Sequence, residues 1–175
     1  EKIVALTFDP HPVSIFAPER TPNLLTILSD KIELLKIHNA DQVAVIKFTK
    51  EFAAMDPEEF VNKVLVEQLK ATTVIVGQNF TYGFKAVGNV QSLGQHTEFE
   101  TIVLDLQSNA EKAISSTRIR TAITNGDVES AREMLTRPHR LDGIVVHGEK
   151  RGREIGYPTA NLGNIEGQTI PADGV

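Results

Sequence analysis

The sequence predicts an α/β protein, with a doubly wound parallel sheet in a first domain and the start of a second, β-rich domain after it. Four short apolar and β-branched runs recur at spacings that fit a strand plus a helix, at residues 3–8, 43–48, 73–76 and 101–104. Runs of this length are typical of strands buried on both faces of a parallel sheet. Because amphipathic segments separate them, the strands and helices alternate, which favours a doubly wound arrangement.

Two helices are predicted between these strands. Asp30, followed three residues later by Glu33, predicts a capping box, and the helix that follows should end near Asn39. Asp56 is expected to cap a second helix over residues 57–69. The apolar residues of this second segment fall on one helical face: Phe60, Val61, Val64, Leu65 and Leu69.

After the fourth strand, two helices are predicted over residues 115–125 and 127–136, separated by Gly126, which can adopt the left-handed conformation that closes a helix. From residue 138 onward, alternating apolar residues and glycines favour β structure. We therefore expect one domain over residues 1–137 and the start of another over 138–175. The second stretch is too short to bury a core of its own.

Composition excludes several classes of protein. The formal charge of −5 argues against binding of a nucleic-acid backbone, and the absence of cysteine removes disulfides and thiolate chemistry. The apolar runs are far shorter than a membrane span, so no membrane partner is expected and the cytoplasm is the default location. The chain opens inside an apolar run, so we expect a fragment cut at both ends, with low stability or self-association into a homo-oligomer.

The first candidate site follows the first strand. Two prolines stiffen a loop that carries an aromatic, an acidic and an imidazole side chain: Phe8, Asp9, Pro10, His11 and Pro12. The alternative is a simple turn in which Asp9 bonds its own backbone. His11 has no second histidine at metal-ligand spacing, so a zinc site is not expected.

The second candidate site follows the third strand, where Phe80, Tyr82 and Phe84 alternate between two glycines and Asn79 supplies an amide. Aromatic faces stack on flat heteroaromatic rings, and an amide both donates and accepts hydrogen bonds. Packing of the aromatic side chains beneath a long loop explains the same pattern, and the sequence leaves both readings open.

The third candidate site is the start of the helix at residue 115, where three hydroxyl side chains precede a cation: Ser115, Ser116, Thr117 and Arg120. Free N–H groups and the helix dipole favour an anion at such a position, and an arginine can pair with phosphate. A redundant helix cap is the alternative. The sequence therefore indicates a phosphate site or a cap.

The tail contains a fourth candidate site in two parts. Glycines and a cation that can surround phosphate oxygens occur at Gly148, Lys150, Gly152 and Gly156. Thr159 and Asn161 carry oxygen donors on one side of an extended strand, which suits a hard cation such as Mg²⁺. A solvated hairpin turn explains the basic run but not the Thr-Ala-Asn sequence.

Taken together, these motifs resemble one known family. Residues 4–12, 48–52, 76–80, 114–120 and 156–161 are similar, in this order, to the prokaryotic bifunctional riboflavin kinases/FMN adenylyltransferases, also called FAD synthetases. Ordered motifs with plausible intervening lengths are far more specific than any one of them alone.

The resemblance implies a Rossmann-like nucleotidylyltransferase domain that transfers AMP from ATP to FMN, followed by a β-barrel riboflavin kinase domain. It implies that residues 115–120 hold ATP phosphates, while residues 8–12 with Asn79 and Phe80 hold the flavin. In the tail it implies that the glycine-rich run binds the kinase nucleotide, and that Thr159 and Asn161 bind Mg²⁺ and nucleotide. The expected ligands are ATP, FMN and riboflavin.

The chain also departs from the family pattern. The family's Gly-x-Phe-Asp-Gly-x-His-x-Gly-His segment is absent and should precede Glu1, and the kinase's carboxylate base should lie beyond Val175. Asn79 and Thr81 replace an Asp and an Arg that are common in the family. Neither catalytic set is complete, so we expect an inactive fragment of an active enzyme. The alternative is a flavin- or nucleotide-binding module without catalysis.

Overall fold

The computed structural model of the chain describes residues 2–109, 112–148, 156 and 160–174. The chain divides into two compact units. The first unit comprises Glu1–Ala5, Pro22–Ala44 and Ile114–Val175, and the second comprises Leu6–Thr21 and Val45–Ala113. Among the described residues, every helix is too short or too polar to cross a membrane.

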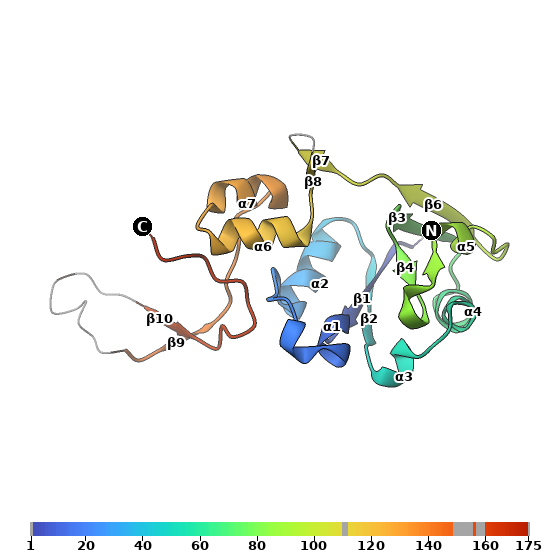
Figure 1. Cartoon of the computed structure of the whole chain (residues 1–175), viewed down its shortest axis with the longest axis horizontal. Coiled ribbons are helices and arrows are strands. Elements are labelled where there is room, and N and C mark those ends of the chain that lie inside the picture. Colours follow the sequence, from blue (N-terminus) through green and yellow to red (C-terminus); the bar gives the residue numbers. More distant parts are fainter. Residues whose placement is uncertain (1, 110–111, 149–155, 157–159, 175) are drawn as a thin grey trace. The chain divides into compact units, whose positions relative to one another are not determined.

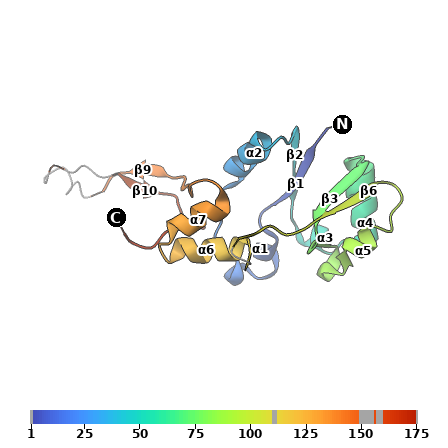
Figure 2. The same ribbon diagram turned by 90° about the horizontal axis from the view of Figure 1, so that it is seen from above.

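The four predicted strands are confirmed, and each observed end lies within one residue of the predicted end. Figures 1 and 2 show these strands as β1, β2, β3 and β6. β1 (Val4–Asp9) pairs with β2 (Gln42–Lys47), and β3 (Thr73–Gly77) pairs in parallel with β6 (Glu100–Leu104). The protein is therefore a mixed α/β structure with a parallel strand pair.

The prediction that these strands are buried on both faces is wrong for β3 and β6. Val74 and Val76 pack against a hydrophobic core, whereas Ile75 and its register partner Ile102 are 60% and 37% exposed. Successive side chains of a strand point to opposite faces, so the core covers one face of β3 and leaves the other open. β6 is less covered, because Val103, the register partner of Val76, is 45% exposed.

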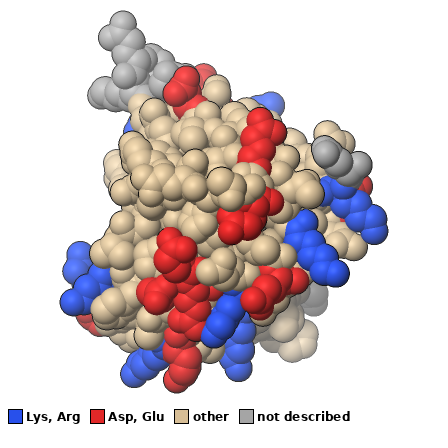
Figure 3. All heavy atoms as spheres, turned by 90° about the vertical axis from the view of Figure 1, so that its right-hand side faces the viewer, with Lys and Arg blue, Asp and Glu red and all other residues tan. Residues whose placement is uncertain are grey.

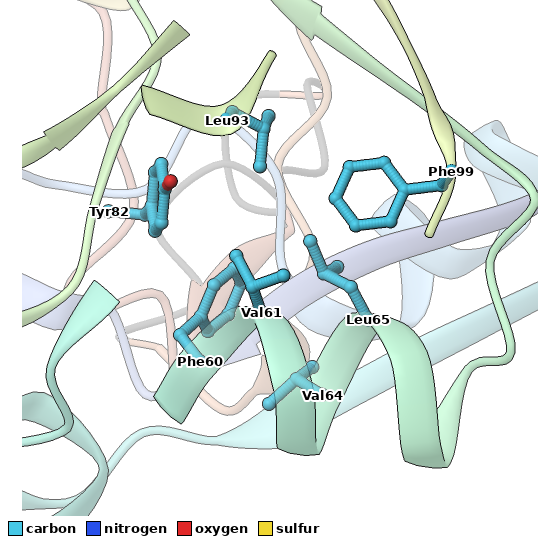
Figure 4. Close-up of a cluster of buried hydrophobic side chains, with 7 residues drawn as sticks. All are labelled: Phe60, Val61, Val64, Leu65, Tyr82, Leu93 and Phe99. Atoms are coloured by element: carbon cyan, nitrogen blue, oxygen red, sulfur yellow. The ribbon is translucent and has the colours of Figure 1, made fainter. Parts of the chain in front are cut away.

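The core of the second unit forms around the predicted helix 57–69. The helix starts as α4 (Pro57–Phe60) and continues as a π-helical stretch, η2 (Val61–Gln68). The carboxylate of Asp56 accepts the backbone N–H of Glu59 at 2.7 Å, which confirms the predicted cap. Figure 4 shows the buried side chains that meet here: Phe60, Val61, Val64, Leu65, Tyr82, Leu93 and Phe99.

Short elements complete the second unit. They are α1 (Pro12–Phe16), η1 (Pro18–Arg20), α3 (Lys50–Ala53), β4 (Thr81–Tyr82), η3 (Phe84–Ala86), β5 (Gly88–Asn89), α5 (Val90–Leu93), β7 (Ser108–Asn109) and β8 (Lys112–Ala113). β4 pairs with β5, and β7 with β8, both antiparallel.

In the first unit, α6 (Ser116–Thr124) and α7 (Val128–Leu135) lie side by side, as Figures 1 and 2 show. Gly126 between them has φ +80°, so both helices and the left-handed turn are confirmed. The helices share a small core formed by Ile119, Ile123, Ala131 and Met134. β9 (Ile144–Val146) and β10 (Asn161–Gly163) form an antiparallel pair, which confirms β structure in the tail.

The predicted capping box at Asp30 is wrong. α2 (Leu28–Ile37) begins three residues earlier than a cap at Asp30 predicts, with Ile27 at its N-cap. Asp30 lies buried in the first turn of α2, where its Oδ2 is 3.4 Å from Nε of Arg140. This carboxylate therefore serves an ion pair with a residue far along the chain instead of a cap. The predicted end of the helix is confirmed, since Asn39 has φ +70° just beyond it.

The face drawn in Figure 3 carries several groups of Asp and Glu side chains, with Lys and Arg side chains dispersed among them and along its margins.

Candidate functional site

The loop after β1 is organised by His11. The peptide between Asp9 and Pro10 is cis, and the Nδ1 atom of His11 accepts the backbone N–H of Val13 at 3.2 Å, which caps α1. The side chain of Asp9 is exposed, whereas its carbonyl accepts the N–H of Phe48 at 3.0 Å. The stiff loop predicted from the sequence thus presents an exposed carboxylate next to a histidine that already serves as a cap.

Aromatic rings connect this loop to the second candidate site. Phe8 contacts Phe52 with ring centroids 5.7 Å apart, and Phe52 contacts Phe60 at 6.2 Å. Phe60 in turn contacts Tyr82 at 5.6 Å, and Tyr82 stacks on Phe80 at 5.6 Å with an interplanar angle of 15°. The second unit therefore joins the two segments predicted to hold a flavin by a continuous series of rings.

The aromatic loop combines packing with exposure. Tyr82 is buried and its hydroxyl lies 3.1 Å from Oγ of Ser92, so packing explains this ring. Phe80 is half-buried and packs against the same core, whereas Asn79 is exposed beside Gly77. An exposed amide beside a half-buried ring is a chemically suitable pair for a heteroaromatic ligand.

The start of α6 is partly a cap. Oγ of Ser115 accepts the backbone N–H of Arg118 at 3.3 Å, which confirms the capping alternative for this hydroxyl. Ser116 and Thr117 occupy the exposed first turn, where free N–H groups favour an anion.

Arg120 has a partner that the sequence did not indicate. Its Nε donates a hydrogen bond of 2.6 Å to the backbone carbonyl of Asn23. Partial burial lowers the pKa of the Arg120 guanidinium from its ordinary value because desolvation disfavours the charged form. Sequence reasoning missed Asn23 because the acceptor is a backbone carbonyl, which every residue has, so the residue type does not indicate this contact.

In the tail, two of the predicted ligands are brought together. A Cβ added to Gly148 would lie only 2.8 Å from Cγ of Asn161, so the side-chain amide of Asn161 lies against the bare backbone of Gly148. Gly156 has φ +82° and open space around it. Lys150, Gly152 and Thr159 lie outside the described residues.

No group of three or more acidic, histidine or cysteine side chains that could hold a metal occurs among the described residues. The amide oxygen of Asn161 is a hard donor of the kind that Mg²⁺ accepts, so this residue fits the predicted ion by its chemistry.

A mixed α/β protein with a parallel strand pair and a hydroxyl-rich helix start after its last long strand is consistent with the nucleotidyltransferase class. The family model described as FAD synthetase matches residues 1–118, and the model described as riboflavin kinase matches residues 135–175. The chain belongs to the FAD synthetase family, and the resemblance inferred from its motifs is confirmed.

Several bacterial relatives named bifunctional riboflavin kinase/FMN adenylyltransferase match nearly the whole chain. The relative from Listeria monocytogenes is 40% identical over 97% of this chain, and that from Bacillus subtilis is 35% identical over 99%. The match covers 55% of each relative, so the chain spans about half the length of these proteins.

A solved structure from Streptococcus pneumoniae, titled a macrolide-efflux protein, matches with a TM-score of 0.89 and 31% sequence identity. The match covers 99% of this chain and 57% of that one.

Proposed function

We propose that the complete protein synthesises flavin cofactors. Its first activity would transfer AMP from ATP to FMN, giving FAD and pyrophosphate, and its second would phosphorylate riboflavin to FMN with ATP. Two family models in this order and the names of the curated relatives support both activities. The structural observation that carries the proposal is the ring series from Phe8 to Phe80, which connects two segments suited to a flavin.

In the adenylyl transfer, a phosphate oxygen of FMN forms a bond to the α-phosphorus of ATP, and the bond from that phosphorus to the bridging oxygen of the β-phosphate breaks. The protein's task in such a step is to position groups and neutralise charge. Asn79 and Phe80, with residues 8–12, would hold the flavin. Ser116 and Thr117 would hold ATP phosphates through their hydroxyls and the free N–H groups of the helix start, together with Arg120.

We also propose how the complete protein is divided into domains and where it binds Mg²⁺. A Rossmann-like sheet would fill residues 1–137, and a riboflavin kinase barrel would begin at 138. Bound Mg²⁺ would neutralise nucleotide phosphates, and Thr159 and Asn161 would hold it in the kinase part. The protein would act in the cytoplasm on small molecules, with neither nucleic acid nor membrane as a partner.

The first test is to incubate the complete protein with FMN, ATP and Mg²⁺ and to measure FAD and pyrophosphate by chromatography. FAD formation is expected. Binding of FMN and ATP without turnover would favour a non-catalytic binding module, and the absence of binding and turnover would overturn the proposal.

The flavin assignment is tested by titrating FMN against Asn79→Ala. Loss of one hydrogen bond to the ring should weaken FMN affinity by about two- to tenfold and leave ATP affinity nearly unchanged. Asn62→Ala is the matched control because Asn62 is an exposed asparagine on η2. Unchanged FMN affinity in Asn79→Ala would refute the assignment even if FAD is formed.

A further inference from the structure

Two segments far apart in the sequence pair within the first unit. The N–H of Leu24 donates to the carbonyl of Gly167 at 2.7 Å, and the N–H of Thr169 donates to the carbonyl of Leu24 at 2.8 Å. Leu24 lies in the region matched by the FAD synthetase model, whereas residues 167–169 lie in the region matched by the riboflavin kinase model. The pairing therefore joins the two parts of the chain that have different proposed activities.

Residues 167–169, in the region matched by the riboflavin kinase model, are fixed by burial and by hydrogen bonds. Thr169 is fully buried, and Gln168 is 7% exposed. The side chain of Gln168 bonds the backbone of Asp142 in both directions, donating from Nε2 at 2.6 Å and accepting at Oε1 at 3.0 Å. The carbonyl of Thr169 also bonds Nε2 of His139 at 2.7 Å. A segment with this many satisfied bonds holds the residue that it contacts in a defined position.

Besides Leu24, the segment contacts the preceding residue, Asn23. Its backbone carbonyl accepts Nε of Arg120 at 2.6 Å and the hydroxyl of Thr169 at 3.3 Å. A carbonyl oxygen has two lone pairs and accommodates both donors. One oxygen atom thus receives a bond from the proposed ATP site and another from the kinase part.

The bond fixes the direction of Arg120. Arg120 lies one helical turn beyond Ser116 and Thr117, on the same face of α6. Since Nε alone reaches Asn23, the two terminal nitrogens are not needed for this contact and remain the part of the fork that suits phosphate. A guanidinium whose Nε is already hydrogen-bonded loses less conformational entropy when it binds an anion, which strengthens binding.

We infer that Thr169 is a positioning residue for adenylyl transfer: the kinase part orients Arg120 toward the phosphates of ATP through the carbonyl of Asn23. This inference rests on the proposed function. It predicts that a hydroxyl in the kinase part influences the ATP affinity of the other activity.

The test substitutes Thr169→Val in the complete protein, which removes the hydroxyl and keeps the shape. The carbonyl of Asn23 keeps its bond from Arg120, so no buried acceptor loses its last partner. The KM for ATP in FAD synthesis should rise by about two- to tenfold, the range of a single hydrogen bond. The KM for FMN and the rate of riboflavin phosphorylation should stay unchanged. Thr26→Val, which removes a hydroxyl that accepts Nη2 of Arg137 at 3.2 Å, is the matched control.

A double-mutant cycle distinguishes positioning from a general effect on structure. Arg120→Lys keeps the positive charge but lacks Nε, so Thr169→Val should raise the KM for ATP no further in that background. Equal effects of Thr169→Val in both backgrounds would overturn the inference, as would an unchanged KM in the single variant. If the valine variant does not fold, Thr169→Ser and Thr169→Ala make the same comparison, because both lack the methyl group and only serine keeps the hydroxyl.

These experiments distinguish a failure of the proposed function from a failure of the positioning role of Thr169. If the unsubstituted protein forms no FAD, the proposed function is refuted. If it forms FAD while serine and alanine at position 169 give the same KM for ATP, only the positioning role is refuted.

Discussion

Gly88→Ala tests how tightly the aromatic loop is packed. Gly88 in β5 faces Tyr82 in β4, and a Cβ at this position would lie 2.8 Å from Cζ and 2.9 Å from Cε1 and Cε2 of the tyrosine ring. Gly88 does not have a positive φ, so alanine at this position meets a neighbouring ring and does not strain the backbone. The substitution is therefore a steric probe of one ring.

The size of the effect follows from what the ring contacts. Ordinary carbon contacts are about 3.5–4.0 Å, so the ring has to move by roughly 1 Å. Tyr82 is 6% exposed and lies between Phe60 and Phe80, which leaves little room for that shift. Overpacking costs about 1–3 kcal/mol, and the lower entropy of the unfolded chain returns about 0.4–1 kcal/mol. We expect a net destabilisation of about 1–2 kcal/mol.

Urea unfolding followed by tyrosine fluorescence and circular dichroism measures this loss. Gly94→Ala is the matched control, because Gly94 is exposed, has φ −71°, and would bring its Cβ no closer than 3.4 Å to a neighbouring atom. The control should be neutral or slightly stabilising. FMN affinity should fall in Gly88→Ala alone, since Phe80 stacks on the displaced ring. Equal unfolding midpoints for the two variants would refute the packing argument.

Two further predictions concern helix caps. Asp56→Ala should lower the free energy of unfolding by about 1 kcal/mol, because it removes the cap of α4; an unchanged urea midpoint would contradict this. The hydrogen bonds that Asp127 receives from Ser130, the side-chain bond first and the backbone bond second, lower the pKa of its carboxyl from the ordinary value. Its stabilisation is therefore complete above the unfolded pKa and is lost as the pH falls through the lowered, folded pKa. Unfolding midpoints of the wild type and Asp127→Asn, which keeps the cap without titrating, should converge or reverse in acid, and a gap independent of pH would show that Asp127 does not contribute in this way.

The sequence by itself determined the elements whose signals are local. The Asp56 cap, the apolar face of the helix after it and Gly126 between α6 and α7 each depend on residues within a few positions of one another, and the structure confirms all three. The four strands were equally readable because short β-branched runs form strands in most environments. The family was readable because its motifs keep their order along the chain.

Only the tertiary structure decided which side chains serve distant partners. Asp30 and Glu33 have the spacing of a cap, yet Asp30 pairs with Arg140. The sequence did not indicate this ion pair, because two residues more than a hundred positions apart leave no local pattern. Arg120 was expected to serve phosphate alone, and its bond to Asn23 became visible only when the chain brought that carbonyl beside α6. Contacts made by backbone atoms do not depend on residue type, so neither composition nor spacing indicates them. The exposed face of β3 likewise follows from which side the core covers, and the tertiary structure alone decides that.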